Sequence, residues 1–198
     1  MTPWTSLLRA AAACAMIAYP VVVWLGLSSG SPRLVATALL AVMAPALLLR
    51  RRAAAREGLA VVPVAIFLLL GAAALLNESG LVLATPVAAN VVLLATFGVT
   101  LRRGSAPMIE RFARLQEPSL DAPKRAWCRL WTKLWCAFFV ANGATAAALA
   151  LRGDLQAWAL YNGMIAYALI AAMLGLEWAL RRARFGPTQG SDSTDEPA

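Results

Sequence analysis

Hydrophobic residues of this chain gather in long uninterrupted stretches, and short polar or basic segments separate one stretch from the next. A helix needs roughly 17–25 apolar residues to cross the hydrocarbon of a bilayer, and most of the stretches approach or exceed that length. The second is shorter, and Arg33 and Arg50 at its ends can extend to the lipid headgroups. The pattern therefore predicts an all-α integral membrane protein with six transmembrane helices, at about residues 7–27, 34–49, 58–76, 81–101, 134–151 and 155–176.

The predicted spans pair into three hairpins whose turns on one side of the membrane are short. The other side carries the only sizeable connection, residues 102–133, in which we expect a loop with a surface helix. Residues 1–185 thus form one six-helix transmembrane domain, and residues 186–198, which lack apolar side chains to bury, should be a disordered cytoplasmic tail. The first stretch has an apolar run of 18 residues, longer than the about 7–15 of a signal peptide, although its cleavage stays an open alternative.

Composition supports a membrane protein and excludes several other classes. Hydrophobic residues make up 61% of the chain and charged residues 14%, against roughly 25% charged residues in soluble domains. One soluble core could not bury so much apolar surface, which excludes a soluble enzyme, a disordered protein and a secreted disulfide scaffold. The chain has no histidine, so histidine triads, bases and metal ligands are excluded. Cys128 and Cys136 have neither disulfide nor zinc spacing, and we interpret them and Cys14 as small apolar residues. We predict no metal, cofactor or catalytic residue.

The distribution of basic residues predicts the orientation in the membrane. The net charge is +8, and 16 of the 18 Lys and Arg residues fall on the side that carries both termini and residues 102–133. Only Arg33 and Arg152 fall on the other side. Because basic residues accumulate on the cytoplasmic side of membrane proteins, both termini should be cytoplasmic. The positive charge then serves orientation and contact with anionic lipids, so we expect membrane lipids as partners and no nucleic acid.

The connection at residues 102–133 contains an amphipathic segment. Its apolar residues recur at helical spacing and share one face: Met108, Ile109, Phe112 and Leu115. We expect Ser105 to cap this helix, Pro107 to occupy its first turn, and Glu110 to point away from the apolar face. Such a helix either lies in the headgroup plane with its apolar face toward lipid or a partner, or packs as an ordinary cytoplasmic helix.

Three tryptophans at four-residue spacing mark the chain's return to the membrane. Trp127, Trp131 and Trp135 alternate with basic residues near the predicted inner boundary. Aromatic residues at that depth usually anchor a helix at the interface. The alternative is a site for a lipid headgroup or a polyprenyl phosphate. We expect Trp158 to lie near the opposite boundary.

Polar residues within the predicted spans are the candidates for function, because polar groups in hydrocarbon are costly. Asn142 and Asn162, each followed by glycine, fall at matching depth in the last hairpin, so we expect their amides to bond across it. With Tyr161 beside them, they form either interhelical contacts or a ligand site. Asn90 is a separate polar centre with the same two interpretations. Glu177 should form an ion pair with a basic residue one turn later, or act as a proton-coupling carboxylate.

The second half of the chain, about residues 105–182, resembles a family of small polytopic bacterial inner-membrane proteins found in gene clusters for aryl-polyene pigments of the xanthomonadin and flexirubin kind. The resemblance lies in these residues: 107–118, Trp135, 138–139, 142–143, 158–163 and 177–178. It implies a multi-pass protein of the inner (plasma) membrane and a setting in aryl-polyene lipid assembly or export, with pathway enzymes as partners. It implies no catalytic residue. The Phe-Phe-x-x-Asn stretch at 138–142 also resembles the intracellular septation protein family, which implies a cell-envelope role.

Three functions remain open on these grounds. The first is a non-enzymatic accessory or scaffold protein of a membrane lipid pathway, consistent with the absence of a catalytic constellation. The second is a transporter or flippase for an amphipathic lipid, consistent with a proline in each of the first four spans. The third is a membrane-embedded transferase that does not use histidine.

Overall fold

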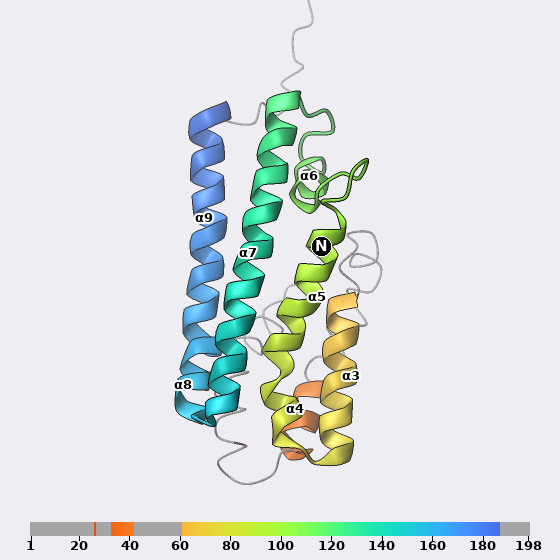
Figure 1. Ribbon diagram of the computed structural model, residues 1–198, viewed down its shortest axis with the longest axis vertical. Helices are drawn as coiled ribbons and strands as arrows, with labels where there is room; N and C mark the ends of the chain where they lie inside the picture. Colours follow the sequence, from red (N-terminus) through yellow and green to blue (C-terminus); the bar gives the residue numbers. More distant parts are fainter. Residues whose placement is uncertain (1–25, 27–32, 42–60, 187–198) are drawn as a thin grey trace, which may run out of the picture.

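The computed structural model describes residues 26, 33–41 and 61–186 (Figure 1). Within these ranges the chain is helical and contains no strand, so the predicted helical class is confirmed for them. Residues 33–41 are helical, and the other helices, in chain order, are α3 (Val61–Leu76), α4 (Ser79–Leu83), α5 (Thr85–Val99), α6 (Met108–Ala113), α7 (Ala122–Arg152), α8 (Leu155–Leu160), the π-helical turn η1 (Tyr161–Ile165) and α9 (Ala166–Phe185). The predicted first span, most of the second and the predicted tail lie outside the described residues.

The long helices lie side by side with their axes close to parallel, in the order α3, α5, α7, α9 (Figure 1). Helix α5 packs closely on both α3 and α7, whereas α9 makes few backbone-level contacts with α7 and the preceding α8 makes more. The short helix α6 packs against α7 at the opposite end of the bundle. The backbones of α7 and α9 thus lie farther apart than those of α5 and α7.

Two helices are long and apolar enough to cross a membrane: Ala122–Arg152, and Leu155–Phe185, which comprises α8, η1 and α9. Each has 31 residues, so both are longer than the predicted spans. Residues 122–133, which the prediction assigned to the connection outside the membrane, are helical, because α7 already begins at Ala122. Asp121 caps this helix by accepting a hydrogen bond from the backbone N–H of Lys124 at 3.0 Å.

The predicted fourth span is interrupted. It divides into α4 and α5 at Ala84, two residues before Pro86. Proline has no N–H to donate into the preceding turn, and the indole N–H of Trp158 donates to the nearby carbonyl of Leu83 at 3.3 Å. Trp158 is only 1% exposed. It therefore belongs to the core at the turn end of the bundle.

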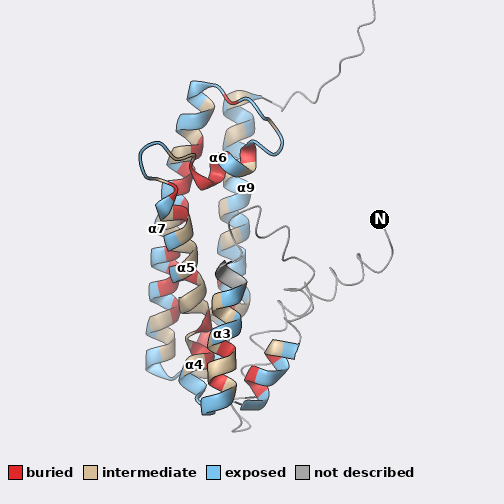
Figure 2. Cartoon of the chain, turned by 90° about the vertical axis from the view of Figure 1, so that its right-hand side faces the viewer, coloured by how far each residue is buried: buried red, intermediate tan, exposed pale blue. Residues whose placement is uncertain are grey.

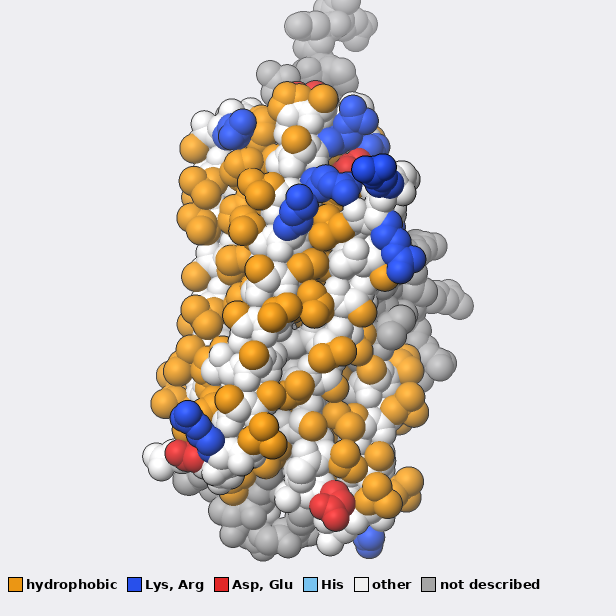
Figure 3. All heavy atoms as spheres, in the orientation of Figure 1, with side chains coloured by type: hydrophobic (Ala, Val, Ile, Leu, Met, Phe, Trp, Pro, Cys, Tyr) orange, Lys and Arg blue, Asp and Glu red, His pale blue; other side chains and the backbone are white. Residues whose placement is uncertain are grey.

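The two ends of the bundle differ in their charged residues. The turn end carries the short connections α3–α4 and α7–α8, where Asn77 and Gly153 adopt positive φ values of 55° and 72°. The basic end carries α6 and all described Lys and Arg residues other than Arg33 and Arg152 (Figure 3). Between the ends the visible surface is largely apolar. This distribution agrees with the charge asymmetry of the sequence.

The buried residues form two clusters, one toward each end (Figure 2). The cluster toward the turn end includes Leu70, Val82 and Trp158 and joins residues 33–41 to α3, α4 and α8. The cluster toward the basic end joins α5, α6 and α7 around aromatic and sulfur-containing side chains. By contrast, α9 is largely exposed apolar surface, which is typical of a helix in contact with lipid.

Candidate functional site

A chain of hydrogen bonds connects three helices near the middle of the bundle. The Tyr161 hydroxyl donates to Asn142 Oδ1 at 2.9 Å, and Asn142 Nδ2 donates to Asn90 Oδ1 at 3.1 Å. Asn90 Nδ2 in turn donates to the carbonyl of Pro86 at 2.8 Å. The two asparagines are each 7% exposed. We call Asn90, Asn142 and Tyr161 the amide chain, and each amide in it both donates and accepts a hydrogen bond.

The amide chain differs from the predicted pairing of Asn142 with Asn162. Asn162 Nδ2 instead donates to the carbonyl of Trp158, on its own helix, at 2.9 Å. Asn90 is therefore not a separate polar centre, but the direct partner of Asn142. Gly143 permits this contact, because a Cβ atom at residue 143 would lie 3.0 Å from the Cβ of Asn90. The glycine faces α5 rather than the following helix.

The π-helical turn explains why Tyr161, and not Asn162, reaches α7. In this turn the backbone N–H of Ala166 donates to the carbonyl of Tyr161, five residues earlier. Such a turn adds one residue to a helix and changes the rotation of the residues around it. A prediction that counts residues from the hairpin turn assumes a regular helix and cannot include this change. The sequence prediction therefore placed both asparagines at matching depth, but assigned the wrong residue to the contact.

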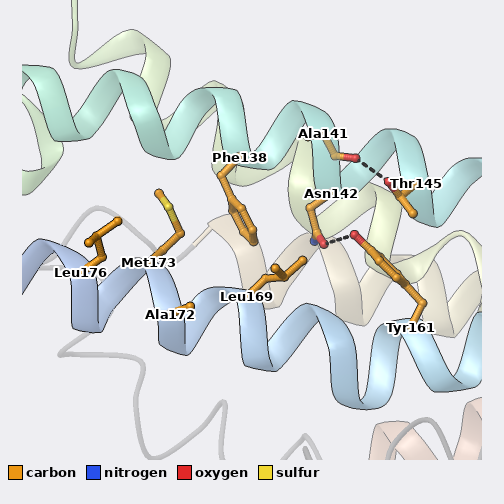
Figure 4. Close-up of a pocket in the computed structure, with 9 residues that line it drawn as sticks. All are labelled: Phe138, Ala141, Asn142, Thr145, Tyr161, Leu169, Ala172, Met173 and Leu176. Atoms are coloured by element: carbon orange, nitrogen blue, oxygen red, sulfur yellow. Dashed lines mark hydrogen bonds between the residues drawn. The ribbon is translucent and has the colours of Figure 1, made fainter.

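An apolar groove of about 490 Å³ lies between α7 and α9, next to the amide chain (Figure 4). The residues that line it are Phe138, Ala141, Asn142, Thr145, Tyr161, Leu169, Ala172, Met173 and Leu176. Only Asn142, Thr145 and Tyr161 among them carry polar side-chain atoms, and these gather toward one end of the groove. Thr145 already donates to the carbonyl of Ala141 at 2.9 Å.

Apart from Asn142 and Tyr161, the groove residues were not identified from the sequence. Those of α7 and those of α9 each recur at helical spacing, and each set includes one alanine, Ala141 and Ala172. Small residues in the contact between two helices leave space unless another side chain fills it. This spacing was the signal available in the sequence. It could not be interpreted without the rotation of the two helices.

A double-mutant cycle tests the amide chain. We expect Asn142→Leu and Asn90→Leu to be coupled, because either substitution leaves the other amide without its partner. Hydrogen bonds between membrane helices contribute about 0.6 kcal/mol on average and rarely more than about 1.7 kcal/mol, so the coupling should fall in that range. Asn162→Leu is the matched control and should add independently to Asn142→Leu. Thermal unfolding in detergent measures the stability of the single and double variants. Coupling of Asn142 to Asn162, and not to Asn90, would contradict the structure.

The amphipathic helix α6 packs into the core. Met108 and Ile109 are 0% and 8% exposed, Phe112 is half-buried, and Leu115 is 73% exposed and lies beyond the helix. The four residues thus do not form one docking face. The structure supports the alternative of a packed helix, and burial of Met108 against α5 and α7 gives the reason.

Side chains from the neighbouring helices bind the first turn of α6. The backbone N–H of Met108 donates to Thr100 Oγ1 at 2.9 Å, and that of Ile109 donates to Thr132 Oγ1 at 3.2 Å. The prediction that Ser105 caps α6 is therefore wrong, since threonines distant in sequence occupy that role. Glu110 is 5% exposed, contrary to the predicted outward orientation, and pairs with Arg114 at 2.6 Å.

The three tryptophans of α7 lie between helices. Trp131 and Trp135 are 2% and 6% exposed, and Trp127 packs on Phe185 of α9 with ring centroids 5.8 Å apart. For Trp131 and Trp135 the predicted role of lipid-facing anchor is wrong, because neighbouring side chains cover their rings. Their indole nitrogens and that of Trp127 have no hydrogen-bond partner among the described residues.

Glu177 does not form the predicted ion pair with Arg181. The guanidinium of Arg181 lies 3.6 Å from the carboxylate of Glu117. The connection between α6 and α7 carries Glu117 over the end of α9, where Lys124 also pairs with it. Glu177 is half-buried and faces the indole of Trp135 without forming a hydrogen bond of normal geometry.

Comparison of the chain with family models, curated proteins and solved structures found no match. The resemblance to aryl-polyene-associated membrane proteins thus stays a prediction from the sequence. In the part of the chain that the structure describes, no three His, Cys, Asp or Glu side chains come together as ligands for a metal ion. The groove and the amide chain are the candidate site.

Proposed function

We propose that the protein is a multi-pass protein of the bacterial inner membrane, with six spans and both termini in the cytoplasm. Two 31-residue apolar helices and the separation of charge between the ends of the bundle support this topology. The basic end would then lie at the cytoplasmic headgroups. The turn end would expose only short connections on the other side.

Reporter fusions test this topology. We expect a fusion after Pro118, in the connection between α6 and α7, to report a cytoplasmic position. Fusions after Ser79 and Gly153, at the turn end, should report the opposite side. The physical reason is the retention of basic segments in the cytoplasm during insertion. A cytoplasmic signal at Ser79 would contradict the six-span arrangement.

We further propose that this membrane protein binds a lipid in the groove between α7 and α9, as a non-enzymatic accessory or scaffold protein of a lipid pathway. The observation that carries the proposal is the groove itself, which is apolar along its length and polar toward one end. Its volume of about 490 Å³ lies within the about 300–1,000 Å³ of ligand pockets. In a bilayer, the apolar molecule in greatest supply beside such a groove is a lipid chain.

The polar end of the groove suits a ligand without charge at that depth. The Asn142 amide and the Tyr161 hydroxyl are already hydrogen-bonded to each other, so they require no charged group for compensation. A hydroxyl or carbonyl group could bond the remaining lone pairs of these side chains. A chain with a weakly polar end fits this chemistry, and the aryl-polyene lipids implied by the resemblance are of that kind. Assembly or export of such a lipid, together with pathway enzymes, is the setting we propose.

A pair of neighbouring substitutions tests lipid binding. Ala172 lines the groove, whereas Ala171 is exposed on α9 and does not line it. We expect Ala172→Phe to fill the groove and reduce the lipid retained after purification, and Ala171→Phe to leave it unchanged. Mass spectrometry of the purified protein measures the bound lipid, and a thermal unfolding curve confirms that both variants fold. Equal lipid content in the two variants would exclude the groove as the binding site.

A flippase is the second candidate, favoured by the position of the groove along an exposed helix pair. A strain lacking the protein distinguishes the two. A scaffold role predicts less finished lipid and loss of association among the pathway enzymes. A flippase predicts normal amounts of finished lipid held in the inner leaflet. An unfinished precursor would indicate the third possibility, a transferase.

A further inference from the structure

The boundary between α7 and α9 continues past the groove to the basic end, where it contains polar groups without partners. We call this region the head seam and define it by Trp127, Trp131 and Trp135 of α7 and Glu177 and Arg181 of α9. The three indole nitrogens are buried and have no hydrogen-bond partner among the described residues. An indole N–H can only donate, and a buried donor without an acceptor is destabilising. Among the residues that define the head seam, Glu177 is the one acceptor, and it forms no hydrogen bond of normal geometry with the indoles.

The same region contains both signs of charge. Glu177 faces Trp135 and has no ion pair within the described part of the chain, since Arg181 contacts Glu117 instead. Arg181 is near enough to Glu177 to interact electrostatically. At the far end of the seam the Arg184 guanidinium lies 5.7 Å from the centre of the Trp127 ring. Donors, a cation, a carboxylate and aromatic faces thus occur together.

The head seam is continuous with the groove. Phe138, which lines the groove, packs on Trp135 with ring centroids 5.6 Å apart. Leu176, which also lines it, immediately precedes Glu177. Trp135 lies seven residues from Asn142, about 10 Å along a helix at 1.5 Å per residue. A molecule lying in the groove would thus meet the head seam at the end that points toward the basic end of the bundle.

We propose that the head seam binds a zwitterionic lipid head whose phosphate accepts from the indole N–H groups and Arg181 and whose ammonium pairs with Glu177, while a chain lies in the groove. This inference rests on the lipid-binding function proposed above. A head with only negative charge would place an anion beside Glu177. A head with only positive charge would leave the indole donors unpaired. The ammonium group would also lie against aromatic faces, which attract cations.

The depth of the head seam agrees with this ligand. The seam lies at the basic end of the bundle, where the proposed topology places the cytoplasmic headgroups. The groove extends from there toward the turn end, as the chain of a lipid extends toward the middle of the bilayer. The indole nitrogens are closed to solvent, so the head must enter along the boundary of α7 and α9.

Binding of two phospholipids to the purified protein tests the proposal. Phosphatidylethanolamine has a phosphate and an ammonium group, whereas phosphatidylglycerol has the phosphate alone. Loss of one hydrogen-bonded charged contact lowers affinity about tenfold. We therefore expect native mass spectrometry to show about tenfold tighter binding of phosphatidylethanolamine. Glu177→Gln should remove this preference, and Trp131→Phe, which keeps a ring but loses the donor, should weaken binding of both lipids.

The matched control is Trp178→Phe, because Trp178 is 65% exposed, contacts Arg182 and lies outside the head seam. It should leave both affinities unchanged. Equal binding of the two lipids to the unchanged protein, or a preference that survives Glu177→Gln, would overturn the head seam and leave groove binding intact. Absence of any bound lipid would overturn both. Unfolding temperatures of the variants show whether the fold is preserved. Because Glu177 is only half-buried, we expect Glu177→Gln to disturb the fold least.

Discussion

Replacement of Met108 by aspartate should detach α6 from the bundle and destabilise the protein by more than about 3 kcal/mol, because a carboxylate without a partner would replace a side chain that is 0% exposed. Met108 packs where α5, α6 and α7 meet, and its own N–H binds Thr100. Since whole domains are stable by only about 5–15 kcal/mol, we expect a large loss of folded protein.

Leu115→Asp is the matched control for Met108→Asp. It introduces the same charge at a residue that is 73% exposed, so stability should change by less than about 0.5 kcal/mol. Fluorescence-detected size exclusion after heating compares the two variants. If Leu115→Asp proved as damaging as Met108→Asp, then a membrane or a partner would contact the Leu115 side, and α6 would be the docking helix that its sequence first indicated.

Replacement of Gly143 by leucine should separate α5 from α7. A Cβ atom at this residue already comes within 3.0 Å of Asn90, and the larger side chain would displace the Asn90 amide from Asn142. Overpacking of a filled contact costs about 1–3 kcal/mol, and the broken hydrogen bond adds to that cost. We expect the unfolding temperature in detergent to fall and lipid retention to decrease with it, because Asn142 also lines the groove.

Gly175→Leu provides the comparison for Gly143→Leu. It lies in α9, where nothing is within 4 Å of an added Cβ atom. The same change of side chain should therefore be tolerated there, with the unfolding temperature close to that of the unchanged protein. If the two variants behaved alike, close packing of α5 on α7 at Asn90 would not exist in solution. Gly143→Ala, with a smaller addition, should give an intermediate effect.

Local rules were sufficient for the helical class of the described residues, and local residues also define several of the observed helix ends. Uninterrupted apolar stretches favour helices in a membrane because each backbone group is then bonded within its own segment. Asp121 and Asp154 accept hydrogen bonds from the first turns that follow them, and Gly153 ends α7 in the left-handed conformation. Each of these features depends on residues adjacent in sequence. The separation of basic residues between the two ends likewise follows from their order along the chain.

Such local rules could not predict the contacts between helices. Most of these helices are apolar on all sides, so periodicity does not reveal which face is inside. The partner of Asn142 depends on two features that rotate or space the helices, the π-helical turn at Tyr161 and the contact of Gly143 with α5. The groove between α7 and α9 likewise depends on the rotation of these two helices, which turns one lined face of each toward the other.

The basic end shows the same division between local and tertiary information. The sequence identified α6 and the tryptophans of α7 as amphipathic elements at a boundary, but left open whether they face lipid or protein. Their burial follows from Thr100 and Thr132, which bind the first turn of α6, and from Glu117, which reaches Arg181 on α9. These contacts join residues that are distant along the chain. Hydropathy measures how readily each segment leaves water, and only packing in three dimensions establishes which neighbour replaces the water.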